Sequence, residues 1–389
     1  MKNLFDNTQI AFSLKSDTEL DRAYFLFKLI ANEPLVRIGT AVTNFALKAS
    51  LPVEGLIRAT VFDHFCAGVN EDDSLKVVDN LFTKGVFSVL DYSVEGKEDE
   101  EQFDAVLEKT LKLIDFAKEK KSIPFAVFKP SGFGRIDLYE EVSLGKKLTS
   151  AESEEWNRVV ARFEKVCKAS YDSDVALLID AEESWMQDAV DNLVEAMMVK
   201  YNKSKPIVFS TLQMYRWDRL DYLKKLHEKA KEDGFFIGMK LVRGAYMEKE
   251  NERAIEKGYP TPICTSKEAT DENYDAAVKY MVDHIDNMSV FEGTHNEAST
   301  YFLMNLMEEK GIPSTDERIW FGQLYGMSDN ISFNLAADGY NVAKYLPFGP
   351  VKDVMPYLIR RAEENTSVAG QTSRELAMIK AERNRRKGK

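Results

Sequence analysis

The sequence predicts an α/β protein folded as a closed (β/α)8, TIM-like barrel, and three observations support this. From about residue 80 onward, short apolar runs rich in β-branched and aromatic residues alternate with amphipathic helical stretches, which is typical of parallel strands joined by helices. Eight such runs are present, the number of strands in this barrel. No GxGxxG follows any run, so the fingerprint of the open doubly wound dinucleotide fold is missing.

The strands are expected in chain order, each ending in a polar cluster. Helical patterns separate them, for example over 101–121, 187–201, 218–232 and 297–310. The stretch 131–170 is longer than one return helix needs, so a helical excursion is predicted after the second strand. The eight runs are GVFSVLDYS (85–93), PFAVFKP (124–130), VALLIDAEE (175–183), PIVFSTLQ (206–213), FFIGMKLVRGAY (235–246), VFEGTHN (290–296), IWFGQLYG (319–326) and KYLPFGP (344–350).

Three segments make up the predicted domain organisation. Residues 1–80 are expected to form an N-terminal helical arm, residues 81–375 the catalytic barrel, and residues 376–389 a basic C-terminal tail. The tail has two alternatives: contact with anionic lipid, or a solvated disordered end. Its cations are Lys380, Arg383, Arg385, Arg386, Lys387 and Lys389, and the arm's apolar helix positions are Leu20, Tyr24, Phe27 and Ile30.

Composition excludes several classes of protein. The 389 residues are 44% hydrophobic without an apolar run of the ~20 residues that a membrane span needs. A net charge of −12 argues against a nucleic-acid surface. The N-terminus resembles neither a secretory signal nor a transit peptide, so a cytoplasmic protein is expected. The three cysteines form no CxxC pair and the four histidines no HxH or HExxH arrangement, so neither a disulfide framework nor a catalytic metal is predicted.

Polar residues should gather at one rim of the barrel, because the carboxyl ends of parallel barrel strands meet there. Cations from three separate strands and a helix would repel one another at this rim, so a bound anion is implied. Two anions suit the pattern better than one. A pyrophosphate-bearing cofactor would take the side of Arg243, Lys267, Thr294, His295 and Asn296, and a small carboxylate would take Lys129, Arg360 and Arg361.

The last strand leads into a helix whose polar face points back over the barrel mouth. Pro350 and Pro356 are expected within its first turn, where a missing backbone N–H costs nothing. The alternative is an ordinary solvated helix surface with intrahelical pairs. The face consists of Tyr357, Arg360, Arg361 and Glu364, at spacings of three, four and seven from the tyrosine.

Several longer motifs, in order along nearly the whole chain, resemble the proline dehydrogenase family, and especially its monofunctional, mitochondrial-type members. These motifs are LDYSVEG, LIDAEES, KLVRGAYMEKENERA, GTHN, WFGQLYGMSDNISF and YLPFGPVKDVMPYLIRRAEEN. The resemblance implies a flavoenzyme of proline catabolism that oxidises L-proline to pyrroline-5-carboxylate, by hydride transfer to N5 of FAD lying across the strand ends. Electrons would then pass to a membrane quinone.

The resemblance also implies roles for individual residues. Lys129, Arg360 and Arg361 would bind the substrate carboxylate, Asp180 would pair with Lys129, and Glu364 would brace the arginines. Leu324, Tyr345 and Tyr357 would wall the proline ring. The implied cofactor-binding residues are Ser210, Lys240, Val242, Arg243, Gly244, Ala245, Tyr246, Lys267, Thr270, Thr294, His295, Asn296 and Gln323.

Three positions depart from the pattern of many bifunctional relatives. Lys240 stands where they have arginine, Ser210 where they have glutamine, and Met247 where they have tryptophan. Neither an aldehyde dehydrogenase region nor a DNA-binding region is expected in this chain. With a quinone as acceptor, the cytoplasmic protein would lie peripherally on the inner face of the cytoplasmic membrane.

Other functions remain open from the residues alone. One is a dehydrogenase for hydroxyproline or a related cyclic amino acid with the same flavin. Another is a barrel lyase or aldolase that uses Lys129 as a Schiff-base amine. A third is a non-catalytic barrel that binds carboxylates. The last two predict a colourless protein, whereas a flavoprotein is yellow.

Overall fold

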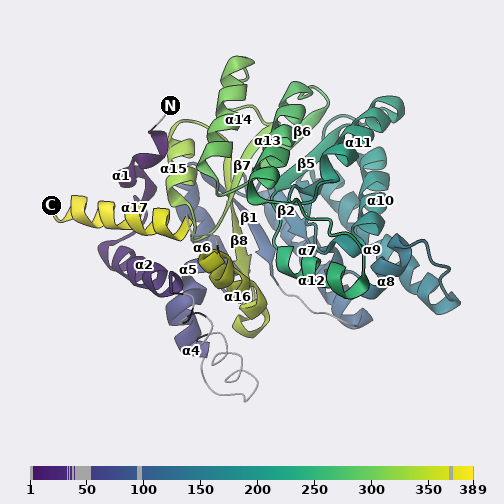
Figure 1. The fold of residues 1–389 in the computed structure, drawn as a ribbon, viewed down its shortest axis with the longest axis horizontal. Helices are drawn as coiled ribbons and strands as arrows, with labels where there is room; N and C mark the ends of the chain where they lie inside the picture. Colours follow the sequence, from purple (N-terminus) through teal and green to yellow (C-terminus); the bar gives the residue numbers. More distant parts are fainter. Residues whose placement is uncertain are drawn as a thin grey trace. The chain divides into compact units, whose positions relative to one another are not determined.

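The computed structural model describes residues 3–32, 54–93, 99–367 and 371–388, with positions 34, 36 and 39; the side chains of 56, 59, 363–367, 371 and 372 are not described. The predicted barrel is confirmed, because eight parallel strands follow one another in chain order round a closed barrel (Figure 1). The strands are β1 (Val86–Tyr92), β2 (Phe125–Phe128), β3 (Ala176–Ile179), β4 (Val208–Gln213), β5 (Ile237–Val242), β6 (Met288–Gly293), β7 (Ile319–Leu324) and β8 (Val342–Phe348).

The chain divides into two compact units. The central unit, Gly96–Phe321, contains β2 to β6, and the terminal unit combines Met1–Glu95 with Gly322–Lys389. Within the terminal unit, β1 and β8 pair in register from Val86 opposite Val342 to Tyr92 opposite Phe348. Parallel strands of this kind place all their carboxyl ends on the same edge, so the carboxyl ends of β1 and β8 are neighbours.

The helices of the central unit confirm the predicted alternation. They are α7 (Glu100–Glu119), α8 (Ile136–Ser143), α9 (Ser150–Ser173), α10 (Ser184–Tyr201), α11 (Arg219–Asp233), α12 (Met247–Lys257), α13 (Lys267–Asp283) and α14 (Glu297–Glu309). The excursion after the second strand is α8, which packs on α10, followed by α9. Thr149 and Glu152 form a capping box that starts α9, and Asp174 ends it in the left-handed conformation.

Aromatic side chains pack edge to face in the core of the central unit. The Phe125 ring lies 5.8 Å from that of Phe209, 5.2 Å from Phe291 and 5.1 Å from Trp320, measured between ring centroids. These rings come from β2, β4, β6 and β7, as expected where barrel strands fill their interior with side chains. Gly238 on β5 leaves them room, since a Cβ there would lie 2.6 Å from the Phe209 ring.

The terminal unit is mostly helical outside its strands. Its elements are η1 (Leu4–Asp6), α1 (Thr8–Ala11), α2 (Asp17–Ile30), α4 (Glu54–Ile57), η2 (Arg58–Phe62), α5 (Asp63–Phe65), α6 (Glu71–Phe82), α15 (Asp329–Ala337), α16 (Val351–Ser367) and α17 (Gln371–Arg386). The predicted apolar face of α2 is confirmed: Leu20, Phe27 and Ile30 are buried, and Tyr24 packs against the same cluster. A capping box of Ser16 and Glu19 starts this helix.

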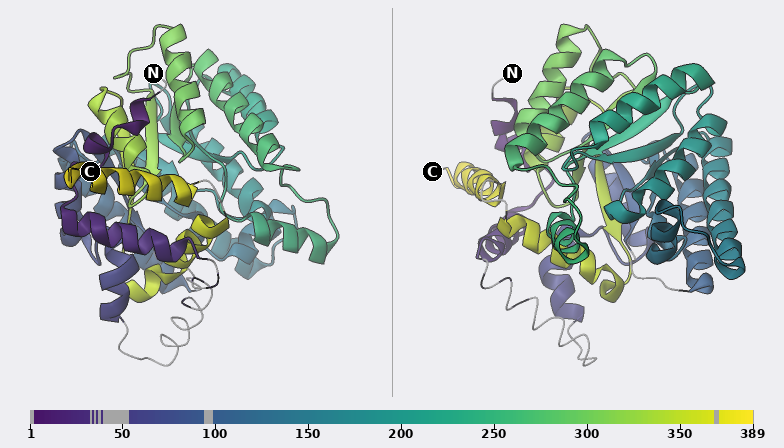
Figure 2. Two further views of the ribbon diagram at one scale, coloured as in Figure 1. Left: turned by 60° about the vertical axis from the view of Figure 1, so that its left-hand side comes forward. Right: turned by 45° about the vertical axis from the view of Figure 1, so that its right-hand side comes forward.

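The C-terminal residues expected as a basic tail form most of α17 in the described part of the chain, so the disordered-end alternative is wrong there. Figures 1 and 2 show α17 alongside α2, and the two helices are in contact. Arg383 Nε donates to Asp21 at 2.6 Å, and Arg386 Nη1 to Asp17 at 2.8 Å. No described helix combines the length and the apolar character that crossing a membrane requires.

The position of Pro356 differs from expectation. Pro350 precedes α16, but Pro356 lies inside that helix and beyond its first turn. Proline has no N–H, so the carbonyl of Lys352 loses its usual helical partner. The local apolar pattern overrides this cost, because Val354, Met355 and Leu358 are all buried in the terminal unit's core.

Candidate active site

Two lysines share one aspartate at the strand ends of the central unit. Lys129 follows β2, Asp180 follows β3, and Lys240 lies on β5. The Lys129 Nζ atom lies 3.6 Å from Asp180 Oδ2, and Lys240 Nζ donates to Asp180 Oδ1. Burial raises the pKa of Asp180, but Lys240 and Lys129 outweigh this effect and hold it below its ordinary value. The predicted Lys129–Asp180 ion pair is therefore present, and Asp180 is a carboxylate at neutral pH.

A second carboxylate fixes the backbone beside Lys129. Glu182 accepts hydrogen bonds from Ser131 N at 2.8 Å and from Ser131 Oγ at 2.6 Å. Gln213 Nε2, at the end of β4, donates to the Glu182 carbonyl at 2.8 Å. Burial, with Glu183 nearby, raises the pKa of Glu182 to about 7. The loop carrying Lys129 is thus tied to the loops that follow β3 and β4.

Arg243, just after β5, is the centre of a network with residues of α13, of the β6–α14 connection and of α14. Its Nε donates to Asp271 at 2.7 Å, its Nη1 to Thr294 Oγ1 at 2.8 Å and its Nη2 to Ser299 Oγ at 3.0 Å. Lys267 Nζ donates to the other Asp271 oxygen at 2.6 Å. The guanidinium is therefore oriented by three partners before any ligand binds.

In the central unit the chain supplies carboxylates to its own cations, so their closeness does not by itself require a bound anion, and the anion stays a prediction. Asp180 forms ion pairs with Lys129 and Lys240, and Asp271 with Arg243 and Lys267. Each aspartate offers two oxygens, which is enough for two cations. The cation most open to a ligand is Lys267, whose side chain is 65% exposed.

The other predicted cofactor-binding residues lie in varied surroundings. Gly244 and Ala245 are exposed, and Gly244 has a φ of 127° with no room for a Cβ, which would lie 2.5 Å from the Tyr215 ring. Asn296 caps α14 by accepting from Ala298 N at 2.9 Å. Val242 is the last residue of β5, and Tyr246 directly precedes α12. Ser210 is buried in β4, and His295 is half-buried. Thr270 Oγ1 donates a hydrogen bond to Ser266 O at 3.1 Å.

The remaining predicted residues belong to the terminal unit. Leu324 ends β7, and Tyr345 on β8 is 7% exposed. Gln323 accepts from Ser332 Oγ at 2.8 Å. On α16 the Arg361 guanidinium lies 5.3 Å from the centroid of the Tyr357 ring, and both side chains are buried. A wholly solvated face is therefore wrong for α16, although Arg360 is half-buried and the Glu364 side chain lies outside the described residues.

The two sets of predicted residues belong to different units. Lys129, Asp180 and the strand-five and strand-six residues lie in the central unit, and the ring-wall and arginine residues lie in the terminal unit. Their convergence on one rim stays a prediction.

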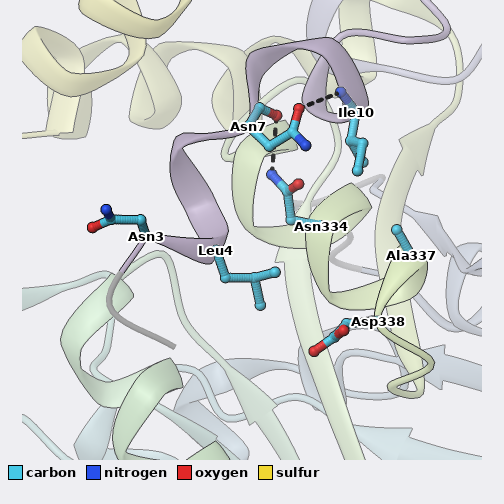
Figure 3. A pocket seen from close by; sticks show the side chains of 7 residues that line it. All are labelled: Asn3, Leu4, Asn7, Ile10, Asn334, Ala337 and Asp338. Carbon is cyan, nitrogen blue, oxygen red and sulfur yellow. Dashed lines mark hydrogen bonds between the residues drawn. The ribbon is translucent and has the colours of Figure 1, made fainter.

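Neither of two hollows in the described surface is lined by a predicted site residue. Figure 3 shows the larger, with a volume of 600 Å³ beside α1 and α15; in it Asn334 Nδ2 donates to Asn7 O at 3.3 Å. A second, of 460 Å³, lies between α10 and α11 and is largely acidic. Among the described residues no group of three or more His, Cys, Asp or Glu side chains could hold a metal ion.

Sequence reasoning missed residues that hold the predicted site residues in place through hydrogen bonds and ion pairs. Asp271 could have been found as the partner of Lys267, because the two are four residues apart on one helix. Glu182 ends up beside Ser131, and no local pattern indicates this contact, because the two positions are 51 residues apart. Lys344 stands in the apolar run of β8, which is an unusual place for a lysine and was a usable signal.

Comparison with known proteins decides the family. The family model described as proline dehydrogenase matches residues 74–374. The chain belongs to the proline dehydrogenase family. It is 35% identical to the carbapenem antibiotics biosynthesis protein CarD of Pectobacterium carotovorum subsp. carotovorum over 362 residues, which cover 92% of this chain and 94% of that protein.

Human mitochondrial proline dehydrogenase 1 is another relative of this family member. It is 40% identical over 236 residues, which cover 60% of this chain and 39% of the human protein. The crystal structure of proline utilization A from Bdellovibrio bacteriovorus is similar in fold, with a TM-score of 0.71 and 21% identity, over 94% of this chain and 37% of that one. The chain therefore spans well under half the length of these two proteins.

Proposed function

We propose that this proline dehydrogenase family member oxidises L-proline to pyrroline-5-carboxylate with FAD as cofactor. The observation that carries the proposal is the cluster of Lys129, Asp180 and Lys240 in the central unit. An ammonium next to a carboxylate is complementary to an amino acid, which has a carboxylate and an amine one carbon apart. Similarity to dehydrogenases named for proline supplies the substrate.

In this proposal the chain's residues bind and orient the ring. Lys129, Arg360 and Arg361 bind the substrate carboxylate, since guanidinium and ammonium groups make charge-assisted hydrogen bonds to carboxylates. Leu324, Tyr345 and Tyr357 enclose the apolar ring carbons, and Glu364 braces the arginines. Holding the carbon next to the nitrogen at reacting distance supplies the main rate advantage.

Asp180 acts by position and charge. Its lowered pKa makes it a weak base, so it accepts a hydrogen bond from the substrate amine without removing a proton from an ammonium group at neutral pH. No strong general base is required if proline binds as the neutral amine, whose N–H proton is lost to solvent as the C=N bond forms. The hydrogen on the ring carbon next to the nitrogen leaves as a hydride, with the electron pair of its C–H bond.

The residues of the central unit fit a dinucleotide cofactor. The exposed Gly244–Ala245 backbone carries almost no side chain, so the chain presents bare backbone there. Lys267 starts α13, whose N-terminus favours phosphate. When bound, FAD supplies the two-electron acceptor. The proposed binding residues are Ser210, Lys240, Val242, Arg243, Gly244, Ala245, Tyr246, Lys267, Thr270, Thr294, His295, Asn296 and Gln323.

The electron acceptor and the location follow as finer proposals. We assign a quinone as acceptor and the cytoplasm as location, with the inner face of the cytoplasmic membrane as the place of electron transfer. The arginines at the end of α17 give this contact little support, because Arg383, Arg385 and Arg386 bind acidic residues of the chain itself.

The decisive experiment is spectroscopic. The purified chain, supplied with FAD, should be yellow, and its flavin absorption should bleach anaerobically on adding L-proline but not on adding D-proline, whose carboxylate points to the wrong side. Lys129→Met should bind FAD and bleach far more slowly, whereas Lys118→Met, a lysine in the last turn of α7, should behave like the unmodified protein.

Three results would replace the proposal. Faster bleaching with trans-4-hydroxy-L-proline would assign the activity to hydroxyproline. A colourless protein that borohydride links to a carbonyl substrate through Lys129 would assign a Schiff-base lyase. A protein that binds proline but neither FAD nor a carbonyl compound would be a non-catalytic binding barrel.

A further inference from the structure

The loop after β7, from Leu324 to Ser328, is held by groups from several elements of the terminal unit. Tyr325 N donates to the carbonyl of Tyr345 on β8 at 2.8 Å. His64 Nε2, from α5, lies 2.9 Å from the carbonyl of Gly326, and burial lowers the pKa of this histidine to about 3, so the neutral ring donates here. Most of the loop is thus bonded to other parts of the unit.

The remaining loop contacts come from two buried charged residues. Glu375 on α17 accepts from Ser328 N at 3.3 Å. Lys344 on β8 is completely buried, and its Nζ donates to the carbonyl of Met327 at 2.5 Å and lies 3.5 Å from that of Leu324. A lysine ammonium has three donors and no acceptor. Two of the three point to this loop.

The third donor of Lys344 completes a buried ion cluster. It lies 2.8 Å from Asp329 Oδ1, while Lys15 Nζ lies 3.1 Å from Asp329 Oδ2. Asp329 is the first residue of α15, where the helix dipole also favours a negative charge. Two lysines therefore share one aspartate, but only Lys344 also bonds to the loop carbonyls.

Stability alone gives little reason for a lysine at this position. Burying an ammonium is costly, and an apolar side chain of similar length is often as stable or more so. The loop also adopts backbone conformations that need support, since Ser328 has a φ of 50° and Gly326 a φ of 81°. A Cβ at Gly326 would lie 2.2 Å from the His64 carbonyl, so the loop can lie only where glycine permits.

We propose that Lys344 is a positioning residue that sets the substrate ring size, by fixing the loop that carries Leu324 against the strand that carries Tyr345. This rests on the proposed function, in which those two side chains enclose the ring. Lys344 precedes Tyr345 in β8 and reaches the Leu324 carbonyl through space, so one ammonium determines the separation of both walls. The substrates that Leu324 and Tyr345 exclude are six-membered cyclic amino acids, whose ring has one methylene more than that of proline.

The test compares Lys344→Met with Lys15→Met, because each removes one ammonium from Asp329 and only the first removes the loop contacts. The ratio of kcat/KM for L-proline to that for L-piperidine-2-carboxylate is measured, together with hydrogen–deuterium exchange of the loop amides without substrate. One methylene in a fitted pocket is worth about 10- to 200-fold. Lys344→Met should lower this ratio by about tenfold, through the KM values, and speed loop exchange.

Lys15→Met should lower the melting temperature and leave the ratio within about threefold of the unmodified value. Equal ratios and equal loop exchange in both variants would overturn the proposal and leave Lys344 as part of a stabilising ion cluster. If Lys344→Met does not fold, Lys344→Arg keeps the charge but places its donors differently, and a lower ratio is again expected. Absence of flavin bleaching by proline in the unmodified chain refutes the proposed function itself, whereas loop exchange still tests the Lys344 contacts.

Discussion

At the residue scale, function depends on side chains whose charge is compensated inside the fold. Asp180 forms ion pairs with Lys129 and Lys240, and Asp271 forms ion pairs with Arg243 and Lys267. Such pairing lets cations lie close together without a ligand, and it fixes their positions before one binds. A substitution that removes one member of such an ion pair should therefore change the positions of the remaining side chains more than it changes the overall charge of the site.

The arginines of α16 give the first prediction. Replacing Arg360 or Arg361 by methionine keeps side-chain length and removes the charged contact to the substrate carboxylate, so kcat/KM for proline should fall about 30- to 1000-fold, mainly through KM. Steady-state kinetics and titration with tetrahydrofuroic acid, a ring carboxylate that cannot be oxidised, measure the loss. Lys352→Met, at an exposed position of the same helix, is the control. Normal KM and analogue affinity in both arginine variants would remove this helix from the substrate site.

Tyr345 provides a test of ring recognition. Its phenol is 7% exposed on β8 and is much bulkier than a serine side chain. The unmodified protein should prefer L-proline strongly over trans-4-hydroxy-L-proline, and Tyr345→Ser should narrow the preference, chiefly by losing efficiency with proline. The kcat/KM values for both substrates decide this, with the melting temperature recorded to separate the effect from a cavity. Similar kcat/KM values in the unmodified protein contradict a steric role.

At the element scale, α17 is a brace for the N-terminal helices. Its Met378 and Ile379 are buried in one core with Leu20 and Phe27 of α2. At its end, Arg386 donates to the carbonyls of Lys15 and Phe12, both at 2.9 Å. The helix thus holds the turn that positions Lys15 beside Asp329, and this links the chain's end to the loop after β7.

Substitutions of two neighbouring arginines of α17 distinguish stabilising contacts of this helix from the effect of its surface charge. Arg386→Met should lower the free energy of unfolding by about 1–3 kcal/mol, because it leaves two backbone carbonyls and Asp17 without this donor. Arg385→Met should leave the free energy of unfolding close to that of the unmodified protein, since among the described residues Arg385 bonds only to Glu382 and is 47% exposed. Denaturant melts measure both. Liposome co-sedimentation should be the same for the two variants; a loss in both, with stability unchanged, would favour the lipid alternative.

At the scale of the whole molecule, buried glutamates should make stability depend on pH. Glu292 on β6 is fully buried, and neither carboxylate oxygen has a hydrogen-bond partner among the described residues. Burial raises its pKa to about 8, with Arg243 opposing and Asp275 adding to the rise. Glu375 behaves similarly, with a pKa raised by burial to about 7.

The sign of the effect follows from which state is ionised. Below about pH 4.5 both folded and unfolded chains carry a protonated Glu292, and no penalty arises. Between that value and about 8 the unfolded chain ionises first, so the folded state loses stability as pH rises. Glu292→Gln should match the unmodified protein near pH 4.5 and exceed it by about 3 kcal/mol at pH 7, after any constant offset is subtracted.

Denaturant melts from pH 4.5 to 8.5 provide the measurement. Glu309→Gln, an exposed position on α14, is the control and should follow the unmodified protein across the whole range. Parallel curves for Glu292→Gln and the unmodified protein would show that Glu292 is ionised in the folded state at neutral pH.

The sequence by itself determined the strand order, the helices between the strands and the types of residue at the strand ends. These properties are local: alternating apolar runs, capping boxes such as Thr149 with Glu152, and turn glycines act over a few residues. It also predicted the Lys129–Asp180 pair, through resemblance to a family.

Only the tertiary structure decided which charges neutralise one another and which segments are buried. Glu182 meets Ser131 from 51 positions away, and Arg386 meets Phe12 from 374 positions away, so no local pattern could indicate either contact. The sequence suggested a basic tail because its arginines are dense, but a buried apolar stripe makes it a packed helix. Such outcomes depend on burial, which changes the energy of a charge and is a property of the whole fold.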